Sequence, residues 1–304
     1  MTIDPQATTA GEWEGTHRPV VVAVDGSERN RSAVLWAAHE AAVEGAGMVL
    51  VTALHERVVH RPHADEHERA VAALTMLDRV RSEVRHLVDE QSVDTRAVPG
   101  APVEVLLDRA ADARLVVVGK RGLSGFARAL VGSTSIALAG RSPVPVAVVP
   151  DDWDPAAHEG RPVVLGVDPF KHEHRPAHLA FRRARRLGVP VLAVHGWEAP
   201  AVLSWDADVI TGALTEHGRE AAARFEEIVA SWRDRFPDVE LRPTTVHRHP
   251  ATAVLEAAED AQLVVLGRHD PGLLGGFTVG SVARAVLHYS ETPVITVPVG
   301  DPPA

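Results

Sequence analysis

The chain of 304 residues repeats itself, and this repeat limits its possible folds more than any other feature. The stretch RPVVVAVDGS begins at Arg18, and RPVVLGVDPF begins at Arg161, 143 positions later. Further along, at a separation of 148, RLVVVGKRG is matched by QLVVLGRHD and SPVPVAVVP by SETPVITVP. Agreement at the start, the middle and the end leaves little room for chance. The sequence therefore predicts two copies of one domain, with a short insertion in the second.

The ends of the repeat give the expected domain boundaries. The stretch PDDWDPAAHEGRP between the copies is rich in Pro, Asp and Gly and has no hydrophobic periodicity, as expected of a linker. We interpret the first residues of the chain as a flexible tail. The predicted parts are a tail at 1–17, a domain at 18–150, a linker at 151–160, a domain at 161–299 and a tail at 300–304.

Each half alternates strand patterns with helix patterns. The run of β-branched residues at 20–24 is typical of a parallel strand that is covered on both faces. In the first half, the patterns predict strands at 20–24, 48–54, 95–98, 115–118 and 144–149, and helices at 30–44, 66–88, 103–111 and after Gly132. The apolar face of the helix at 66–88 would consist of Ala70, Leu74, Leu77, Val84 and Leu87 or Val88, and that of the long helix in the second half of Ala221, Phe225, Ile228 and Trp232. The predicted fold class is α/β: two repeated doubly wound domains, each a five-stranded parallel sheet sandwiched by helices.

Ligands of such sheets bind beyond the carboxyl ends of the strands, and the residues there suit a nucleotide. Gly119 and Gly122 would let the backbone approach a ligand closely. Gly132 and the hydroxyl residues after it begin a helix, whose free N–H groups and positive dipole end suit a phosphate. Asp25, at the end of the first strand, can accept hydrogen bonds from ribose hydroxyls. The residues together therefore predict a nucleotide site.

Each of these residues taken alone also has an ordinary structural explanation. The glycines can be turn formers, Ser133 can be a helix N-cap, and Asp25 can be a surface carboxylate. Their occurrence at the ends of two different strands favours a site.

The spacing of these residues resembles a known signature. Gly119, Gly122, Gly132 and Ser133 match the G-x2-G-x9-G-(S/T) pattern of the ATP-binding universal stress proteins, and the opening VVVAVDGS is also similar. The resemblance covers both halves, so the chain looks like a tandem member of that family. It implies an adenine nucleotide alpha hydrolase-like fold that binds ATP or another adenine nucleotide, with Mg²⁺ as an optional companion of the nucleotide. It also implies a nucleotide-dependent regulator or sensor of the stress response.

Carrying the family's contacts onto this sequence gives a specific pocket in the first half. Adenine and ribose would lie at Val24 and Asp25, and the phosphates at the glycines and the helix terminus. The implied contacts are Val24, Asp25, Ala53, Val118, Gly119, Arg121, Gly122, Gly132, Ser133, Thr134 and Ser135. Lys120, Arg121 and Arg128 could supply positive charge to the triphosphate, or could simply be exposed to solvent, as long basic side chains usually are.

The second half departs from this pattern at the site. Gly26 and Ser27 are replaced by Pro169 and Phe170, and Gly122 is replaced by Asp270, which is followed by Pro271. A carboxylate about 4 Å from a phosphate charge costs about 4 kcal/mol at an effective dielectric constant near 20. The remaining candidates in this half are Asp168, Gly267, Gly280 and Ser281. We therefore predict that ATP binds mainly in the first half and weakly or not at all in the second.

Other function classes find less support. The resemblance implies no catalytic residues, so we expect no dedicated catalytic activity. A slow ATPase or nucleotide-dependent phosphotransferase that uses the same pocket is the alternative, and a scaffold with an empty pocket is a third reading. Neither the Gly-x-Gly-x-x-Gly pattern of dehydrogenases nor a P-loop is present.

Composition narrows the partners. A net charge of −10 argues against nucleic acid and anionic membranes as partners, and the absence of Cys excludes disulfides and thiol chemistry. No apolar run approaches the roughly 20 residues that span a bilayer, and the N-terminus does not resemble a signal peptide. We therefore expect a cytoplasmic protein.

Two groups of histidines and the last strands complete the predictions. The groups are His60, His63 and His67, and His172, His174 and His178. They lack a matching set of carboxylates or thiolates, so we predict no metal site. By analogy with single-domain relatives, the halves would pair as a pseudo-dimer through 144–149 and 294–297, and two chains could form a homodimer.

Overall fold

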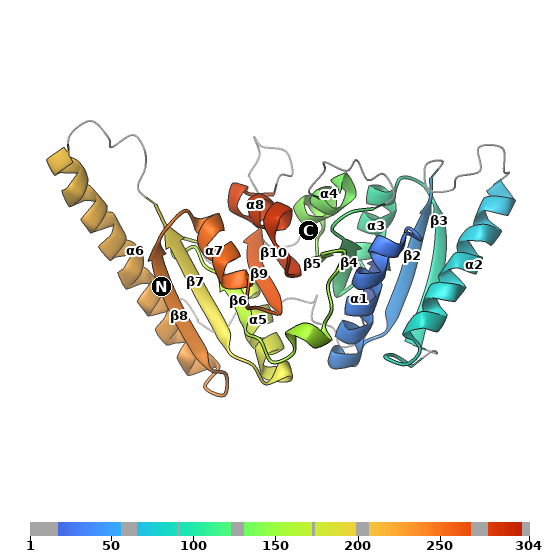
Figure 1. Ribbon diagram of the computed structural model, residues 1–304, viewed down its shortest axis with the longest axis horizontal. Coiled ribbons are helices and arrows are strands. Elements are labelled where there is room, and N and C mark those ends of the chain that lie inside the picture. Colours follow the sequence, from blue (N-terminus) through green and yellow to red (C-terminus); the bar gives the residue numbers. More distant parts are fainter. Residues whose placement is uncertain are drawn as a thin grey trace, which may run out of the picture. The chain divides into compact units, whose positions relative to one another are not determined.

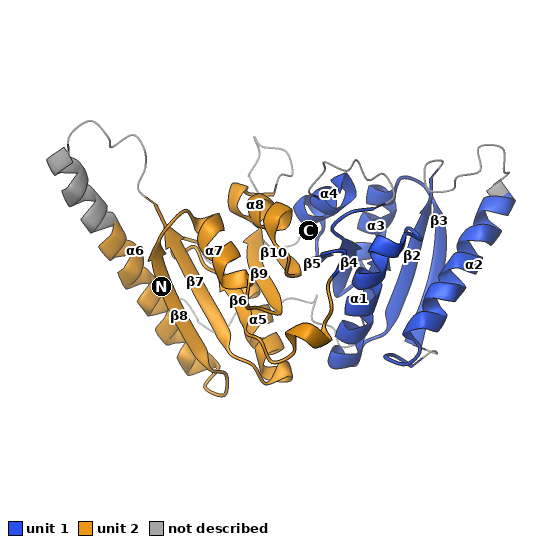
Figure 2. Cartoon of the chain, in the orientation of Figure 1, with its two compact units in different colours: residues 1–152 blue, residues 153–304 orange. Residues whose placement is uncertain are grey.

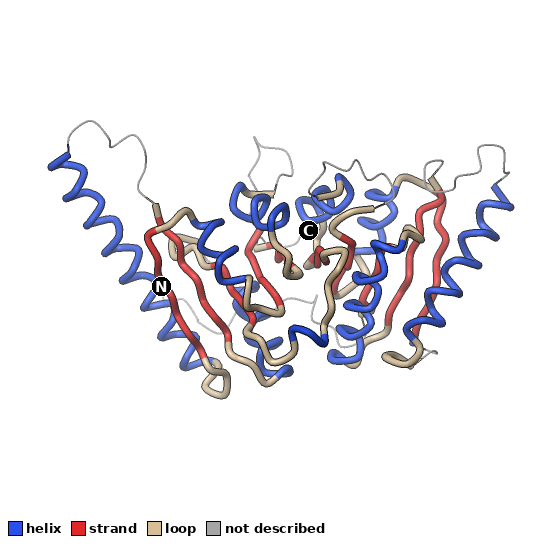
Figure 3. The backbone as a smooth tube through the Cα atoms, viewed as in Figure 1, coloured by secondary structure: helices blue, strands red, loops and turns tan. Residues whose placement is uncertain are grey.

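The computed structural model divides the chain into two compact units, 1–152 and 153–304 (Figure 2). The residues that it describes are 18–55, 66–89, 92–122, 131–171, 174–198, 207–268 and 279–299. In each unit, strands alternate with helices along the chain (Figure 3).

Unit 1 is a parallel sheet of five strands with helices on both faces (Figure 1). Its strands are β1 (Val20–Ala23), β2 (Met48–Leu54), β3 (Val93–Pro99), β4 (Leu115–Gly119) and β5 (Val146–Val149). Its helices are α1 (Arg31–Glu44), α2 (Glu66–Val84), α3 (Pro102–Ala110) and α4 (Ser133–Arg141), and a 3-10 turn, η2 (Glu28–Asn30), precedes α1. The strand order is β3-β2-β1-β4-β5 and every pairing is parallel. This confirms the predicted architecture.

Unit 2 repeats the same arrangement. Its strands are β6 (Val163–Gly166), β7 (Val191–Trp197), β8 (Leu241–His247), β9 (Leu263–Arg268) and β10 (Val294–Pro298). Its helices are α5 (His174–Leu187), α6 (Ala207–Arg235), α7 (Pro250–Ala258) and α8 (Ser281–Tyr289), with a 3-10 turn, η4 (Ala156–His158), inside the predicted linker. The order β8-β7-β6-β9-β10 is again fully parallel.

The core of each unit follows from the continuous apolar strands. Every residue of β4, β5 and β6 is buried, as required of parallel strands that have helices on both faces. In unit 1, α1 contacts α2, and α3 contacts α4, which gives one helix layer on each face of the sheet. In unit 2, α7 contacts α8, and Phe181 of α5 stacks on Phe236, just after α6, at 4.5 Å between ring centroids.

The turn after the first helix of each unit requires glycine. Gly45 ends α1 with φ of 61°, and its counterpart Gly188 follows α5 with φ of 66°. Residues with a Cβ rarely adopt this left-handed conformation, so glycine is favoured here. The first strand and helix of each half therefore end at equivalent points.

One predicted detail of the long helix in unit 1 is wrong. We expected Leu74 on its apolar face, but 43% of Leu74 is exposed, and Ala73 is buried in its place. Ala73 and Leu77 are four residues apart and share one helical face, whereas Leu74 lies one position further round. The equivalent helix of unit 2 buries Ala221, Phe225 and Trp232 as predicted, but the predicted Ile228 is only half-buried, and its neighbour Val229 is buried instead.

Candidate functional site

Unit 1 contains a cavity of about 280 Å³, which we call cavity 1, beyond the carboxyl ends of its strands. It lies where the strand order reverses between β1 and β4, the usual ligand position in doubly wound sheets. All eleven residues implied by the resemblance in the first half line it. The fold therefore brings together segments that are far apart in the sequence.

The three signature glycines are needed for space, since all the described glycines with positive φ lie elsewhere. A Cβ on Gly122 would lie 2.9 Å from Oδ2 of Asp25, and one on Gly119 would lie 3.1 Å from the carbonyl oxygen of Arg121. A Cβ on Gly132 would meet the carbonyl oxygen of Lys120 at 3.5 Å, an ordinary contact. Position 122 is therefore the most restrictive of the three.

The carboxylate of Asp25 is held in place by its own turn. Its Oδ1 accepts hydrogen bonds from the backbone N–H of Ser27 at 2.9 Å and from the Ser27 hydroxyl at 2.7 Å. Asn30 donates from Nδ2 to the carbonyl of Ala23 at 3.0 Å, which ties the start of α1 to the end of β1. The two bonds from Ser27 therefore orient the carboxylate toward one fixed direction.

The N-terminus of α4 opens into cavity 1. Gly132, not Ser133, is the N-cap, so the reading of Ser133 as the cap is wrong by one residue. No side chain caps this helix, and its first intrahelical bond runs from the amide of Ile136 to the carbonyl of Gly132. The amides of Ser133, Thr134 and Ser135 precede that bond, so they have no acceptor within the helix. They form an anion-binding arrangement.

Ser135 has a structural contact of its own. Its hydroxyl donates to the carbonyl of Gly119 at 2.7 Å, and Ser135 is buried. This bond ties the first turn of α4 to the end of β4. The hydroxyl proton is thereby engaged within the protein, so the backbone amide of Ser135 is what it can offer to a ligand.

The predicted cations differ in position. Arg121 lines cavity 1, and its Nε lies 2.9 Å from Oδ2 of Asp151. Lys120 is buried and is not among the residues that line the cavity, so the expected contribution of Lys120 to the phosphate site is not supported. Arg128 lies outside the described residues.

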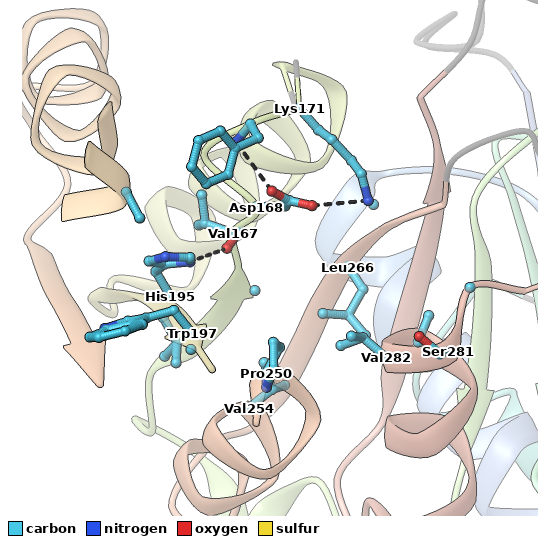
Figure 4. Close-up of a pocket in the computed structure, with 18 of the residues that line it drawn as sticks. Val167, Asp168, Lys171, His195, Trp197, Pro250, Val254, Leu266, Ser281 and Val282 are labelled. Atoms are coloured by element: carbon cyan, nitrogen blue, oxygen red, sulfur yellow. Dashed lines mark hydrogen bonds and ion pairs between the residues drawn. The ribbon is translucent and has the colours of Figure 1, made fainter. Parts of the chain in front are cut away.

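Unit 2 contains a cavity of about 380 Å³, which we call cavity 2, at the equivalent place (Figure 4). All four predicted second-half residues line it. Asp168 accepts a hydrogen bond from the amide of Phe170 at 3.1 Å and pairs with Nζ of Lys171 at 2.9 Å. His195 is 5% exposed, and its Nδ1 lies 3.1 Å from the carbonyl of Val167. Asp270 and Pro271 lie outside the described residues.

Comparison with known proteins decides the family. The family model of the universal stress proteins matches residues 16–150 and 160–298. The chain belongs to the universal stress protein family. A universal stress protein of Mycolicibacterium smegmatis is 33% identical over 291 residues, which cover 93% of this chain and 97% of that protein.

Solved universal stress proteins include one that shares the fold over almost the whole chain. One from Archaeoglobus fulgidus has a TM-score of 0.67 at 19% identity, and it covers 95% of this chain and 99% of its own. Another, crystallised in complex with cAMP, is 27% identical, covers 44% of this chain and 98% of its own, and has a TM-score of 0.37. The tandem two-domain arrangement predicted from the sequence is thus confirmed by the family matches.

Further residues of this universal stress protein line cavity 1 that the sequence reasoning missed. They are Ala23, Asn30, Val51, Thr52, His55, Pro102 and Leu106. Pro102 is the first residue of α3, and it follows the carboxyl end of β3 closely. The rule that ligands bind at strand ends could have identified Pro102 and His55, which follow β3 and β2. Thr52 and Leu106 lie inside elements and carry no such signal.

The described part of this universal stress protein has neither a candidate metal cluster nor a candidate membrane-spanning helix. No group of three or more His, Asp or Glu in it could hold a metal ion. Of the two histidine groups, His60, His63 and His172 fall outside the described residues. None of the described helices is both long and apolar enough to cross a bilayer.

Proposed function

We propose that this chain binds ATP in cavity 1 and acts as a nucleotide-dependent regulator of the stress response. The observation that carries the proposal is the meeting of an oriented carboxylate and an uncapped helix N-terminus in one cavity at the ends of the strands. An oriented carboxylate suits the ribose hydroxyls, and the amides of the helix terminus suit phosphate.

The proposed pose follows from the chemistry of the lining. Adenine packs against Val24, Ala53 and Val118, which are apolar and buried. The ribose hydroxyls donate to Asp25, and the phosphates lie over Gly119 and Gly122 and reach the first amides of α4. Binding energy for the phosphates comes mainly from backbone N–H groups, because the single described cation that lines the cavity, Arg121, is already paired.

A Mg²⁺ ion that accompanies ATP would be held mainly by the phosphates and water. Asp25 is the single carboxylate among the described residues that line cavity 1, and Mg²⁺ often keeps several waters when it is bound with a nucleotide. The residues therefore fit a nucleotide-borne ion better than a resident one.

Regulation by a bound nucleotide requires that ATP bind one conformational or assembly state more tightly than another.

The alternative function, a slow ATPase or nucleotide-dependent phosphotransferase, needs a group that accepts a proton near the γ-phosphate. His55 is the one imidazole among the described residues around cavity 1 and is the candidate. Turnover of Mg-ATP by the purified chain, lost in His55→Gln, would favour this alternative.

The proposal is tested by closing cavity 1. Gly122→Asp puts a carboxylate against both Asp25 and the phosphates, and we expect it to lower ATP affinity about a thousandfold in calorimetry. Gly47→Ala is the matched control, since its Cβ makes an ordinary contact at 3.4 Å to Ser92. Unchanged ATP affinity in Gly122→Asp, or no adenine nucleotide bound to the unaltered chain, would refute the proposal.

Three further properties, namely pairing of the halves, cytoplasmic location and association of two chains, also stay predictions. We expect the halves to pair as a pseudo-dimer in a cytoplasmic protein, with association of two chains as a further option. Sedimentation of the full chain and fractionation of cells test them.

A further inference from the structure

Cavity 2 differs from cavity 1 in its charges. Among the described residues, cavity 2 is lined by the two carboxylates of Asp168 and Glu198 and by one ammonium, that of Lys171. That ammonium is already paired with Asp168 at 2.9 Å, as Figure 4 shows. Glu198 takes the place that His55 has in cavity 1. A ligand with several negative charges therefore meets net repulsion here.

The anion-binding end of cavity 2 is also less polar. The first residues of α4 are Ser133, Thr134 and Ser135, whereas those of α8 are Ser281, Val282 and Ala283. Two of the three hydroxyl residues are thus replaced by apolar ones, and Val282 and Ala283 line the cavity. The amides of the helix terminus remain, but the hydroxyl groups around them are fewer.

Cavity 2 has two aromatic side chains, Phe170 and Trp197, which we call the aromatic wall. Phe170 and Trp197 line cavity 2, whereas the equivalent positions of unit 1 hold Ser27 and Leu54. Aromatic residues make up only 4% of the chain, so two of them at one cavity are a marked local change. Phe170 is 43% exposed. The other large apolar side chains described as exposed, Val71, Leu74 and Tyr289, line neither cavity.

The two rings are held in position from outside the cavity. The indole of Trp197 lies 4.4 Å from the His247 ring, and a Cβ on Gly218 of α6 would approach it to 2.8 Å. The guanidinium of Arg224 lies 4.9 Å from the centre of the Phe170 ring. A flat ligand ring would therefore meet a surface that is already ordered, which lowers the entropic cost of binding.

We propose that cavity 2 is a second binding site, selective for a nucleoside over a nucleoside triphosphate. The base stacks on the aromatic wall, and the ribose hydroxyls donate to Asp168. Because a nucleoside has no phosphates, it places no negative charge near Glu198 or the apolar start of α8. The proposal goes beyond an ATP site in unit 1, and it rests on the proposed function only in taking the position of Asp25 and Asp168 as the ribose position. The chain would then sense a charged and an uncharged form of one ligand class at two sites.

The test uses the full chain with cavity 1 closed by Gly122→Asp, and adenosine and ATP as separate probes in calorimetry. We expect adenosine to bind at one site, and ATP to bind that site at least about tenfold more weakly because of the carboxylates. Adding Phe170→Ala should lower the affinity for adenosine about tenfold through loss of stacking. Tyr289→Ala removes an exposed ring that lines neither cavity, so it should leave the affinity for adenosine unchanged.

A variant that gains affinity for ATP completes the test, because a misfolded protein would lose binding and not gain it. Glu198→His with Val282→Thr restores two features of cavity 1, and we expect ATP affinity of cavity 2 to rise about tenfold. The inference is overturned if adenosine does not bind the Gly122→Asp chain, if ATP binds it as tightly as adenosine, or if Phe170→Ala has no effect. Failure of the proposed function has a different signature, which is the absence of ATP binding to the unaltered chain.

Discussion

At the scale of single residues, Asp25 and Gly122 depend on each other. The carboxylate of Asp25 occupies the space that a side chain at position 122 would need. A side chain at 122 would therefore displace the carboxylate even when no ligand is bound. The constraint on this glycine arises in the protein itself, in addition to any contact with phosphate.

Ser135→Ala should destabilise unit 1 more than it weakens nucleotide binding. The mutation removes the buried bond from the Ser135 hydroxyl to the carbonyl of Gly119, and we expect the free energy of unfolding to fall by about 1–3 kcal/mol. Urea denaturation measures this. Ser133→Ala removes an exposed hydroxyl in the same turn and should change stability by less than about 0.5 kcal/mol. Equal losses in the two variants would contradict the structural role of Ser135.

The sequence could place these residues at one site but could not give their contacts. Gly119, Gly122 and Gly132 stand out because their spacing after a buried strand matches the family signature. The contact of Gly122 with Asp25 joins positions distant in the chain, so only the folded backbone reveals it. Lys120 shows the opposite case: a cation beside the signature looks like a phosphate ligand, yet the side chain is buried away from the cavity.

At the scale of elements, the strongly apolar strands could be predicted from the sequence, whereas the bounds of the edge strand of the unit 1 sheet could not. The second strand was predicted at 48–54 and is β2 (Met48–Leu54), because a short run that is mostly apolar and follows glycines fits a buried strand better than a helix. The edge strand β3 runs from Val93 to Pro99, longer than the predicted 95–98. Asp94 and Arg96 are exposed on this strand, and their charges interrupt the apolar pattern by which a strand is predicted. The strand is ordered by its pairing with β2, which the sequence pattern does not show.

Phe181→Ala should destabilise unit 2 strongly. The Phe181 ring is fully buried, stacks on Phe236 at 4.5 Å and lies 5.8 Å from the Trp232 ring, so its removal leaves a large cavity between α5 and α6. We expect the free energy of unfolding to fall by about 3–5 kcal/mol, as measured by urea denaturation followed by tryptophan fluorescence.

Two comparisons make that result specific. Phe181→Leu keeps most of the volume and should cost less, and Tyr289→Ala, at an exposed ring, should be nearly neutral. The equivalent residue of unit 1 is Ala38, so unit 1 packs its first helix without this ring. A loss below about 1 kcal/mol in Phe181→Ala would show that the helices close the gap.

At the scale of the whole molecule, one fold is used twice with different cavity linings. The repeat predicted the duplication, because residues at both ends and the middle coincide. It did not predict that cavity 2 would be the larger, since Pro169 and Phe170 in place of Gly26 and Ser27 suggested bulk in the site. The size of a cavity depends on where side chains point, and a sequence pattern does not contain that information.

ATP should protect one unit only. With ATP at about 100 times its dissociation constant, we expect unit 1 to gain about 2.7 kcal/mol of stability against unfolding. Hydrogen exchange measured by mass spectrometry should then slow in β1, β4 and α4, while β6, β9 and α8 exchange as before. Slowing of equal size in both sets would mean that ATP also occupies cavity 2.

The ion pair between Arg121 and Asp151 has a consequence for the segment that joins the repeats. Arg121 faces cavity 1, whereas Asp151 is the first residue of the predicted linker, and its carbonyl accepts a bond from the Ser32 hydroxyl. An anion that attracts the guanidinium competes with Asp151 for the same charge. By thermodynamic reciprocity, a change in the linker that loosens this ion pair would tighten anion binding by the same factor by which a bound anion loosens the pair.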